Sequence, residues 1–458
     1  MLLEQRTLAL LQKILPELEA GFDLPGLAPP SESDYRKLEE ILGEVAVSLR
    51  GNYPYFHPLY AGQMQKPPHP VARAAYMLAM WLNPNNHAFD GGKASSPMEK
   101  EAVAGIARMF GWETHLGHLT GGGTMANLEA LWVAGKEHPD MWIVGSELAH
   151  YTHERISEVL KLKFKKIKAL PNGKMDTADL ERTLKEIPVG TVVATMGTTG
   201  LGTVDPLKDL LDLQQKYGFR IHADGAYGGY YILAGNLNGD TAEQFGLLEQ
   251  VDSIVIDPHK HGLQPYGCGC VLFRDREAAK WYLHDSPYTY YSSDEIHLGE
   301  ISLECSRAGA SAVGLWATMR MLPPVPGGEF AGILADCRKA ALELYARLRS
   351  DDRWITIMSP ELDIVVWTLK GPDTRTISES ARSFFKLAEA NQLYLSLFQY
   401  PTSKLPPSPD GPIVNTEYIT CLRACLMKPE HLSWIDELWE RIMRTMDHPD
   451  LKKSLTHV

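Results

Sequence analysis

The fold is decided by the stretch SIVIDPHKHGLQPYGCGCVLF (253–273), in which a polar turn carrying a lysine joins two apolar runs. The first run is continuous and β-branched, which is typical of a strand buried on both faces of a sheet. It ends in Asp257-Pro258-His259-Lys260, so we expect Lys260 at the carboxyl edge of the sheet, where α/β proteins bind ligands. A single lysine after a strand is most often a solvated surface residue, so its role depends on the other motifs.

Short β-rich runs alternate with helical runs from about residue 114 onward. This alternation predicts an α/β fold with a mostly parallel sheet covered by helices on both faces. Asp176 is placed to cap one of these helices, and Pro206 to open another. The expected strands are 142–146, 191–195, 220–224, 253–257 and 270–273, and the expected helices are 124–137, 176–187 and 206–217.

The two ends of the chain follow other patterns. Helices without a strand are expected before residue 96, and the charged residues inside the first apolar run indicate an amphipathic helix and not a signal peptide. Ser96 is expected to cap a helix, with Glu99 completing a capping box. After residue 326, long helices and single strands indicate an α+β unit. We therefore predict an N-terminal helical segment (1–95), a large domain (96–326) that carries the ligand site and a small C-terminal α+β domain (327–458).

Composition excludes several classes of function. The formal net charge of −12 argues against nucleic acid or an anionic membrane as a partner, and no stretch approaches membrane-spanning length. The six cysteines match neither a disulfide framework nor a zinc knuckle, so we expect reduced thiols, no metal and a cytoplasmic location. His150 and His153 have a metal-like spacing, but no further ligands complete a site.

Four motifs besides the lysine turn carry chemistry. Gly122, Gly123 and Thr124 form a turn before a helix, which offers free N–H groups to a phosphate without matching the P-loop or dinucleotide fingerprints. His150 follows a strand and is placed to stack on a flat ring. Asp224 ends a strand, where it could keep a pyridine nitrogen protonated or simply cap a helix. The fourth motif is the glycine-rich turn that follows Thr195.

The order of these motifs is more informative than any one of them. Together they supply a phosphate anchor, a face contact, a carboxylate for a ring nitrogen and, in Lys260, an amine that forms an imine. A flat phosphorylated aldehyde accounts for all of them, and this predicts pyridoxal 5′-phosphate (PLP) as the cofactor.

The chain resembles the fold-type-I PLP enzymes, and among them the group II amino-acid decarboxylases. Within that group it is most similar to the bacterial and archaeal tyrosine/aspartate decarboxylase branch, with some likeness to sphingosine-phosphate lyases. This resemblance implies a seven-stranded-type sheet and a homodimer whose active sites lie between the chains. The motifs that carry it are TGGGTMAN (120–127), SELAH (146–150), ATMGTTG (194–200), HADGAY (222–227), DPHK (257–260) and LECSRAGASA (303–312).

The resemblance also implies roles for individual residues. Lys260 would form the imine and Asp224 would face the pyridine nitrogen, with His150 and Ala226 on the two faces of the ring. Arg423 would meet the substrate carboxylate. The remaining cofactor contacts would be Gly122, Gly123, Thr124 and His259 at the phosphate, Thr195 near the ring substituents and Ser306 at a phosphate across the subunit interface.

The reaction implied is loss of CO2 from an L-amino acid that replaces Lys260 in the imine, followed by proton return to Cα. Tyr266 and Tyr288 are the candidate proton donors, with Tyr290 and Tyr291 as alternatives to Tyr288. An aromatic substrate such as tyrosine is favoured over aspartate or glutamate. An aminotransferase or C–C lyase would use the same motifs. Retention of Lys260, Asp224 and His150 together argues against a relative without activity. The candidate substrate-binding residues are Tyr60, Gln63, Asn86, His87 and Phe89.

Overall fold

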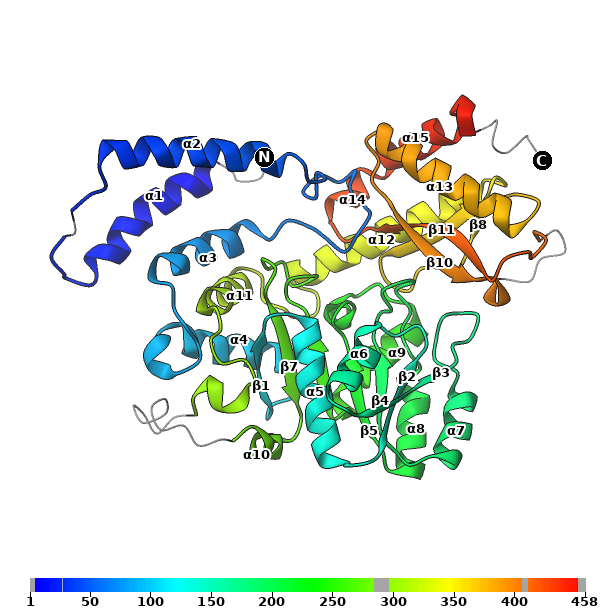
Figure 1. The fold of residues 1–458 in the computed structure, drawn as a ribbon, viewed down its shortest axis with the longest axis horizontal. Coiled ribbons are helices and arrows are strands. Elements are labelled where there is room, and N and C mark those ends of the chain that lie inside the picture. The colour runs from blue at the N-terminus through cyan, green and yellow to red at the C-terminus, as the bar shows by residue number, and fades with distance from the viewer. Residues whose placement is uncertain (1–4, 27, 284–295, 406–410, 452–458) are drawn as a thin grey trace.

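The larger of two sheets orders the molecule in the computed structural model, which describes residues 5–26, 28–283, 296–405 and 411–451 (Figure 1). Its strand order is β1-β7-β6-β5-β4-β2-β3. Neighbours from β3 to β6 are parallel, whereas β7 is antiparallel to both β6 and β1, so the predicted mostly parallel sheet is confirmed. The strands are β1 (Leu116–Thr120), β2 (Trp142–Ser146), β3 (Lys163–Ile167), β4 (Val189–Thr195), β5 (Arg220–Asp224), β6 (Ser253–Ile256) and β7 (Gly269–Phe273).

The central strands are buried on both faces. Every residue of β4, β6 and β7 is buried. Because successive side chains point to opposite faces, Ile254 and Ile256 join one hydrophobic cluster while Val255 joins another. Helix α5 (Gly123–Glu137) packs against β6 and β7, and α8 (Leu207–Tyr217) packs against β5. Burial on both faces explains why these strands are continuous apolar runs in the sequence.

The remaining helices of this part begin close to where the sequence predicts. Asp176 caps α7 by accepting hydrogen bonds from the N–H groups of Ala178 and Asp179, and Pro206 is the residue before α8. The capping box at Ser96 is wrong. Helix α4 begins at Ser95, and the Glu99 carboxylate turns inward, where it pairs with Arg307 at 2.8 Å. The other helices are α4 (Ser95–Met109), α6 (Thr152–Val159), α7 (Thr177–Glu186), α9 (Gly239–Gly246), α10 (Ala279–Tyr282) and α11 (Gly309–Met321).

A second, antiparallel sheet of order β10-β11-β9-β8 lies in the C-terminal part, as expected for an α+β unit. Segment 59–61 contacts this sheet, since Cys425 N donates to Ala61 O at 2.7 Å. The domain boundaries at residues 95 and 326 stay predictions. The elements are α12 (Glu329–Arg349), β8 (Trp354–Thr356), β9 (Ile364–Leu369), α13 (Thr374–Ala390), β10 (Ser396–Pro401), β11 (Tyr418–Cys425), α14 (Glu430–Ser433) and α15 (Ile435–Met446).

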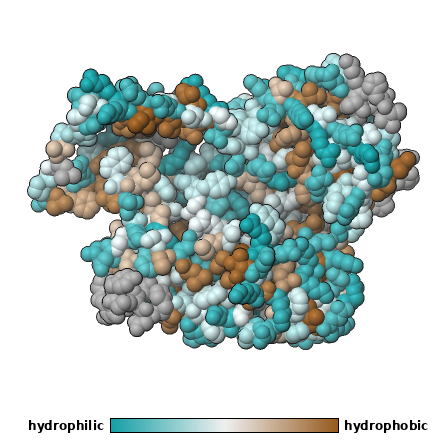
Figure 2. Space-filling view, viewed as in Figure 1, coloured by the Kyte–Doolittle hydropathy of each residue, from teal (hydrophilic) through white to brown (hydrophobic). Residues whose placement is uncertain are grey.

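The N-terminal helices are α1 (Gln5–Ala20), α2 (Glu32–Leu49) and α3 (Pro70–Leu82), and α1 and α2 form an arm that extends away from both sheets (Figure 1). No residue of α2 is buried. Figure 2 shows apolar side chains gathered along the arm. Its large exposed apolar residues are Leu8, Leu10, Ile14, Phe22, Leu24, Tyr35, Leu38, Ile41, Leu42, Val45, Val47 and Leu49. None of the helices in the described ranges is both long and apolar enough to cross a membrane.

Candidate active site

One cavity of about 540 Å³ opens where β1, β4, β5 and β6 end. These four strands point the same way, so the turns that follow them meet at one edge of the sheet. Every predicted cofactor-binding residue except Ser306 lines this cavity. They are Gly122, Gly123, Thr124, His150, Thr195, Asp224, Ala226, His259 and Lys260.

Lys260 lies in the turn after β6, where its Nζ is 2.9 Å from Asp257 Oδ2. Burial alone would lower the pKa of Lys260, but the charge of Asp257 and the hydrogen bond to it raise the pKa above its ordinary value. The lysine is therefore held as an ammonium ion as long as its ion pair with Asp257 remains intact. The second oxygen of Asp257, Oδ1, is buried and accepts no hydrogen bond from the described residues.

Asp224, at the end of β5, is held as an anion inside the protein. His153 Nε2 donates to Asp224 Oδ2 at 2.8 Å, and Ala226 N donates to Oδ1 at 3.1 Å. Burial alone would raise the pKa of Asp224, but the hydrogen bond and charge of His153 keep it below its ordinary value. The arrangement presents a fixed negative charge to the cavity.

Behind Asp224, His222 joins three elements. Its Nδ1 is 2.9 Å from Ser253 Oγ on β6, and its Nε2 is 2.8 Å from Asn127 Oδ1 on α5. Burial lowers the pKa of His222 to about 3, so the ring is neutral. This network fixes β5 and β6 relative to the helix that begins at the glycine turn.

The glycine turn between β1 and α5 leaves helix N–H groups facing the cavity. No side chain in the described part of the chain caps α5, so its first N–H groups and the positive end of its dipole remain available to an anion. Gly122 has a φ of +151°, which favours glycine. A Cβ at Gly123 would lie 2.6 Å from Asp257 Oδ2, so only glycine fits beside that carboxylate.

Comparison with known proteins agrees with this arrangement. Residues 30–370 match the model of the pyridoxal-dependent decarboxylase conserved domain. The chain belongs to the pyridoxal-dependent decarboxylase family. It is 31% identical to an L-aspartate decarboxylase of Thermococcus kodakarensis, over 62% of this chain and 73% of that protein. It is 26% identical to an L-tyrosine decarboxylase of Enterococcus faecium, over 73% of this chain and 72% of that protein.

The fold closely resembles that of a solved structure. The crystal structure of mouse CSAD superposes with a TM-score of 0.77 at 20% identity, covering 94% of this chain and 92% of that one. The predictions of PLP as cofactor and of an amino-acid decarboxylase of the aspartate/tyrosine branch are confirmed. The family match gives no support to an aminotransferase or C–C lyase.

The cavity of this pyridoxal-dependent decarboxylase fits its cofactor. The uncapped start of α5 suits a phosphate. Thr195 Oγ1 and Asp257 Oδ1 are buried polar atoms with no partner among the described residues, and such atoms normally pair with a ligand or water. Lys260 supplies an amine, and Asp224 supplies a buried anion that lines the same cavity. Burial lowers the pKa of His150, so its ring is neutral and suited to stacking.

Several predicted residues lie outside the cavity lining, among them Tyr266, Tyr60 and Arg423. Tyr266 is 56% exposed, and its ring contacts the His259 ring at a tilt of 34° with the centroids 4.7 Å apart. Its hydroxyl donates a hydrogen bond to Met64 O at 3.1 Å. Tyr60 is buried, and its hydroxyl contacts Gln65 and the Gln63 N–H. Arg423 on β11 is 6% exposed and contacts Cys425 Sγ at 3.2 Å. Tyr288, Tyr290 and Tyr291 lie outside the described residues.

A second group lies together but away from the cavity of the same chain. Asn86 is fully buried, and its Nδ2 donates to Glu99 Oε2 at 2.6 Å. His87 accepts the Gly299 N–H at its carbonyl. Ser306 is exposed, and its hydroxyl accepts a hydrogen bond from Asn85 Nδ2 at 3.2 Å. The structure therefore brings segment 85–87 and Ser306 together, and none of these residues lines the cavity that contains Lys260.

Sequence reasoning missed two residues of the site. Asp257 pairs with Lys260, and its position three residues earlier in a turn is the signal that could have found it. His153 pairs with Asp224. It lies in the first turn of α6, three residues after His150, which precedes the helix.

Proposed function

We propose that this decarboxylase acts on an aromatic L-amino acid such as tyrosine, with aspartate or glutamate as the nearest alternative. The supporting observation is the charge of the cavity. Among its described lining residues, Lys260 is the only lysine and there is no arginine. A carboxylate side chain would need a further cation to offset its desolvation, whereas Met125, Leu128 and Tyr227 offer apolar and aromatic surface.

The residues of the cavity take complementary roles in this proposal. PLP, when bound, accepts the electron pair released as the Cα–carboxylate bond breaks. Asp224 holds a proton on the ring nitrogen, and the first N–H groups of α5 hold the phosphate. Lys260 would offer its amine, while His150 and Ala226, which both line the cavity, would flank the two faces of the ring. Closure of the cavity around the substrate would exclude water and strengthen these electrostatic contacts.

A tyrosine hydroxyl returning the proton to Cα also belongs to the proposal. Tyr266 is held near His259, but its hydroxyl is engaged by the Met64 carbonyl. Tyr288 stays the alternative donor, and the role of Arg423 at the substrate carboxylate stays a prediction.

A panel of L-amino acids tests the substrate. With saturating PLP, we expect kcat/KM for tyrosine to exceed that for aspartate by roughly 10–100-fold, because a carboxylate side chain would be buried without a partner. Release of CO2 and formation of the amine are both measured. Faster turnover of aspartate than of tyrosine would contradict the assignment and leave the decarboxylase reaction intact.

We propose in addition that the protein is a homodimer whose cavities are completed by the partner chain. Two observations support this. The arm of α1 and α2 exposes a continuous set of apolar side chains that a second copy would cover. Ser306 and segment 85–87 are gathered at one place without reaching the cavity of their own chain. In the dimer, Ser306 and His87 reach the partner's cavity, and buried Asn86 positions His87.

Mixed dimers test this sharing of sites. In one mixed dimer, one chain carries Lys260→Ala and the other His87→Ala; in a second, one chain carries both substitutions and the other neither. If His87 acts across the interface, the second has roughly tenfold lower kcat/KM than the first, since its one functional lysine faces the altered His87. If the first mixed dimer is the less active one, His87 acts in the active site of its own chain. Equal kcat/KM values for the two mixed dimers would show that His87 acts in neither site.

We also propose a cytoplasmic location. All six cysteines are free thiols and five of them are buried. Burial raises the pKa of the Cys270 and Cys337 thiols, which keeps them unreactive, and a pattern of unpaired thiols is usual in reducing compartments.

A further inference from the structure

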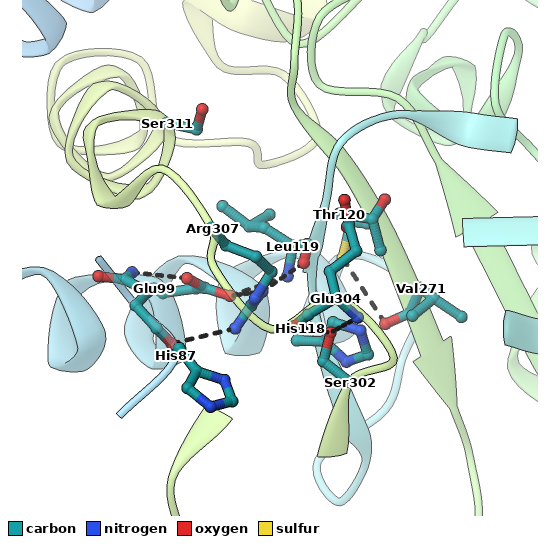
Figure 3. Close-up of polar contacts among 12 residues, drawn as sticks. His87, Glu99, His118, Leu119, Thr120, Val271, Ser302, Glu304, Arg307 and Ser311 are labelled. Carbon is teal, nitrogen blue, oxygen red and sulfur yellow. Dashed lines mark hydrogen bonds and ion pairs between the residues drawn. The ribbon is translucent and has the colours of Figure 1, made fainter. Parts of the chain in front are cut away.

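Arg307 points into the protein from the segment that carries Ser306, and it meets Glu99 of α4 (Figure 3). Arg307 Nη1 is 2.8 Å from Glu99 Oε1, with side chains only 7% and 2% exposed. Two charges removed from water this completely are costly unless their remaining hydrogen-bonding positions are also filled. Arg307 Nε has no partner among the described residues, and the partners that fill the other positions show what the pair holds in place.

One set of hydrogen-bond partners of the Arg307–Glu99 pair lies at the glycine turn of the same chain. Glu99 Oε1 accepts the Leu119 N–H at 3.0 Å, and the Arg307 guanidinium donates to the Leu119 carbonyl. Leu119 lies on β1, two residues before Gly121. Glu304, three residues before Arg307, accepts the Gly121 N–H at 2.9 Å. The buried pair and its segment therefore fix both the end of β1 and the first residue of the phosphate turn.

The other set of partners leads to the residues proposed to act in the partner's cavity. Arg307 Nη2 donates to the Asn86 carbonyl at 3.3 Å, and Glu99 Oε2 accepts from Asn86 Nδ2 at 2.6 Å. Asn85 Oδ1 accepts the Arg307 N–H at 3.0 Å, while its Nδ2 binds Ser306. The same ion pair thus holds the backbone on which His87 and Ser306 are mounted.

We propose that Arg307, acting through Glu99, is a positioning residue for both active sites of the dimer. It fixes the position of the glycine turn in its own chain. It also fixes the position of the segment that its chain presents to the partner's cavity. The inference rests on the proposed sharing of sites. A shift of the ion pair moves both features together, so PLP binding at one site is coupled to the geometry of the other.

Mixed dimers with Arg307→Lys test the coupling. The first joins an unaltered chain to a chain with Lys260→Ala and Arg307→Lys, so the one functional lysine has an intact turn but receives altered partner segments. The second joins a Lys260→Ala chain to an Arg307→Lys chain, so the functional site has an altered turn and intact partner segments. The reference joins an unaltered chain to a Lys260→Ala chain. PLP fixed to Lys260 by borohydride is measured by mass spectrometry against PLP concentration.

We expect half-saturation to rise about tenfold in both Arg307→Lys dimers relative to the reference, a usual scale for coupling between sites. If PLP half-saturation rises in the second dimer alone, Arg307 acts only on the glycine turn of its own chain, and the proposal is overturned. A rise in the first dimer alone, or in neither dimer, would also overturn it. Failure of the His87 test with a normal dimer mass would instead reject the sharing of sites.

Arg320→Lys is the matched control. Arg320 forms an exposed ion pair with Glu101, with side chains 60% and 51% exposed, between α11 and the same helix α4. Exposed pairs contribute little, so we expect PLP half-saturation to remain at the reference value. Thermal unfolding without PLP separates positioning from stability. Because disturbing a buried pair costs more stability than disturbing an exposed one, half-saturation is measured at a temperature where both variants remain folded. A rise at that temperature for Arg307→Lys supports positioning, and a rise seen only where the variant begins to unfold would contradict it.

Discussion

Lys260→Ala is expected to lower kcat by about 10³-fold or more, the scale reached when a group that forms a covalent bond in catalysis is removed. The variant keeps the start of α5 and Asp224, so it still binds PLP through the phosphate and the ring. It has lost the amine that the substrate must displace. The measurement is kcat at saturating PLP, together with the mass of the protein after borohydride reduction.

Lys208→Ala is the control for this experiment. Lys208 is an exposed lysine on α8 that pairs with Glu243. Its loss leaves both kcat and the fixed PLP unchanged, because the residue lies outside the cavity. Recovery of one fixed PLP per chain from Lys260→Ala would show that another lysine carries the cofactor.

Asp224→Asn is expected to lower kcat by roughly 10²–10³-fold, as removal of one fixed electrostatic contact at a reacting centre does. Asparagine has nearly the shape of aspartate and can still accept a hydrogen bond from His153. It lacks the charge that favours a protonated ring nitrogen. The loss should therefore fall on kcat far more than on the amount of PLP fixed to Lys260.

Asp209→Asn provides a matched loss of one carboxylate. Asp209 lies on the exposed first turn of α8, so the change alters total charge without touching the cavity. We expect wild-type kcat for this variant. A wild-type kcat for Asp224→Asn would show that the ring nitrogen does not depend on this carboxylate.

Much of the cavity was predictable because its residues follow buried strands. Asp224 is the last residue of one buried strand and Lys260 lies four residues after the end of another, and parallel strands bring such positions to one edge of the sheet. Gly122 and Gly123 were predictable for a similar reason, since a glycine turn between a strand and a helix has a strong local signature. The antiparallel return of β7 was not visible in the pattern, because a buried strand has the same apolar run in either direction.

Contacts between segments that are distant in the sequence could not be predicted from local sequence patterns. Glu99 follows a serine at the spacing of a capping box, so local rules assign it to the helix start. In the folded chain, Arg307 offers a stronger, charge-assisted partner from 208 positions away, and the carboxylate turns inward. His153 was likewise assigned no role, because its partner Asp224 is 71 positions distant.

The pairing of β1 with β7 has a consequence for how the enzyme is made. Leu116 pairs with Phe273, so the strand that leads into the phosphate turn lacks its sheet neighbour until β7 has been synthesised. At about 5–20 residues per second, the ribosome needs roughly 8–30 s to add the intervening chain. Gly269 packs against Gly122 so closely that a Cβ would lie 2.5 Å from the Gly122 carbonyl carbon. A nascent chain can therefore capture its coenzyme only late in translation, after the last strand of the sheet has closed against the first.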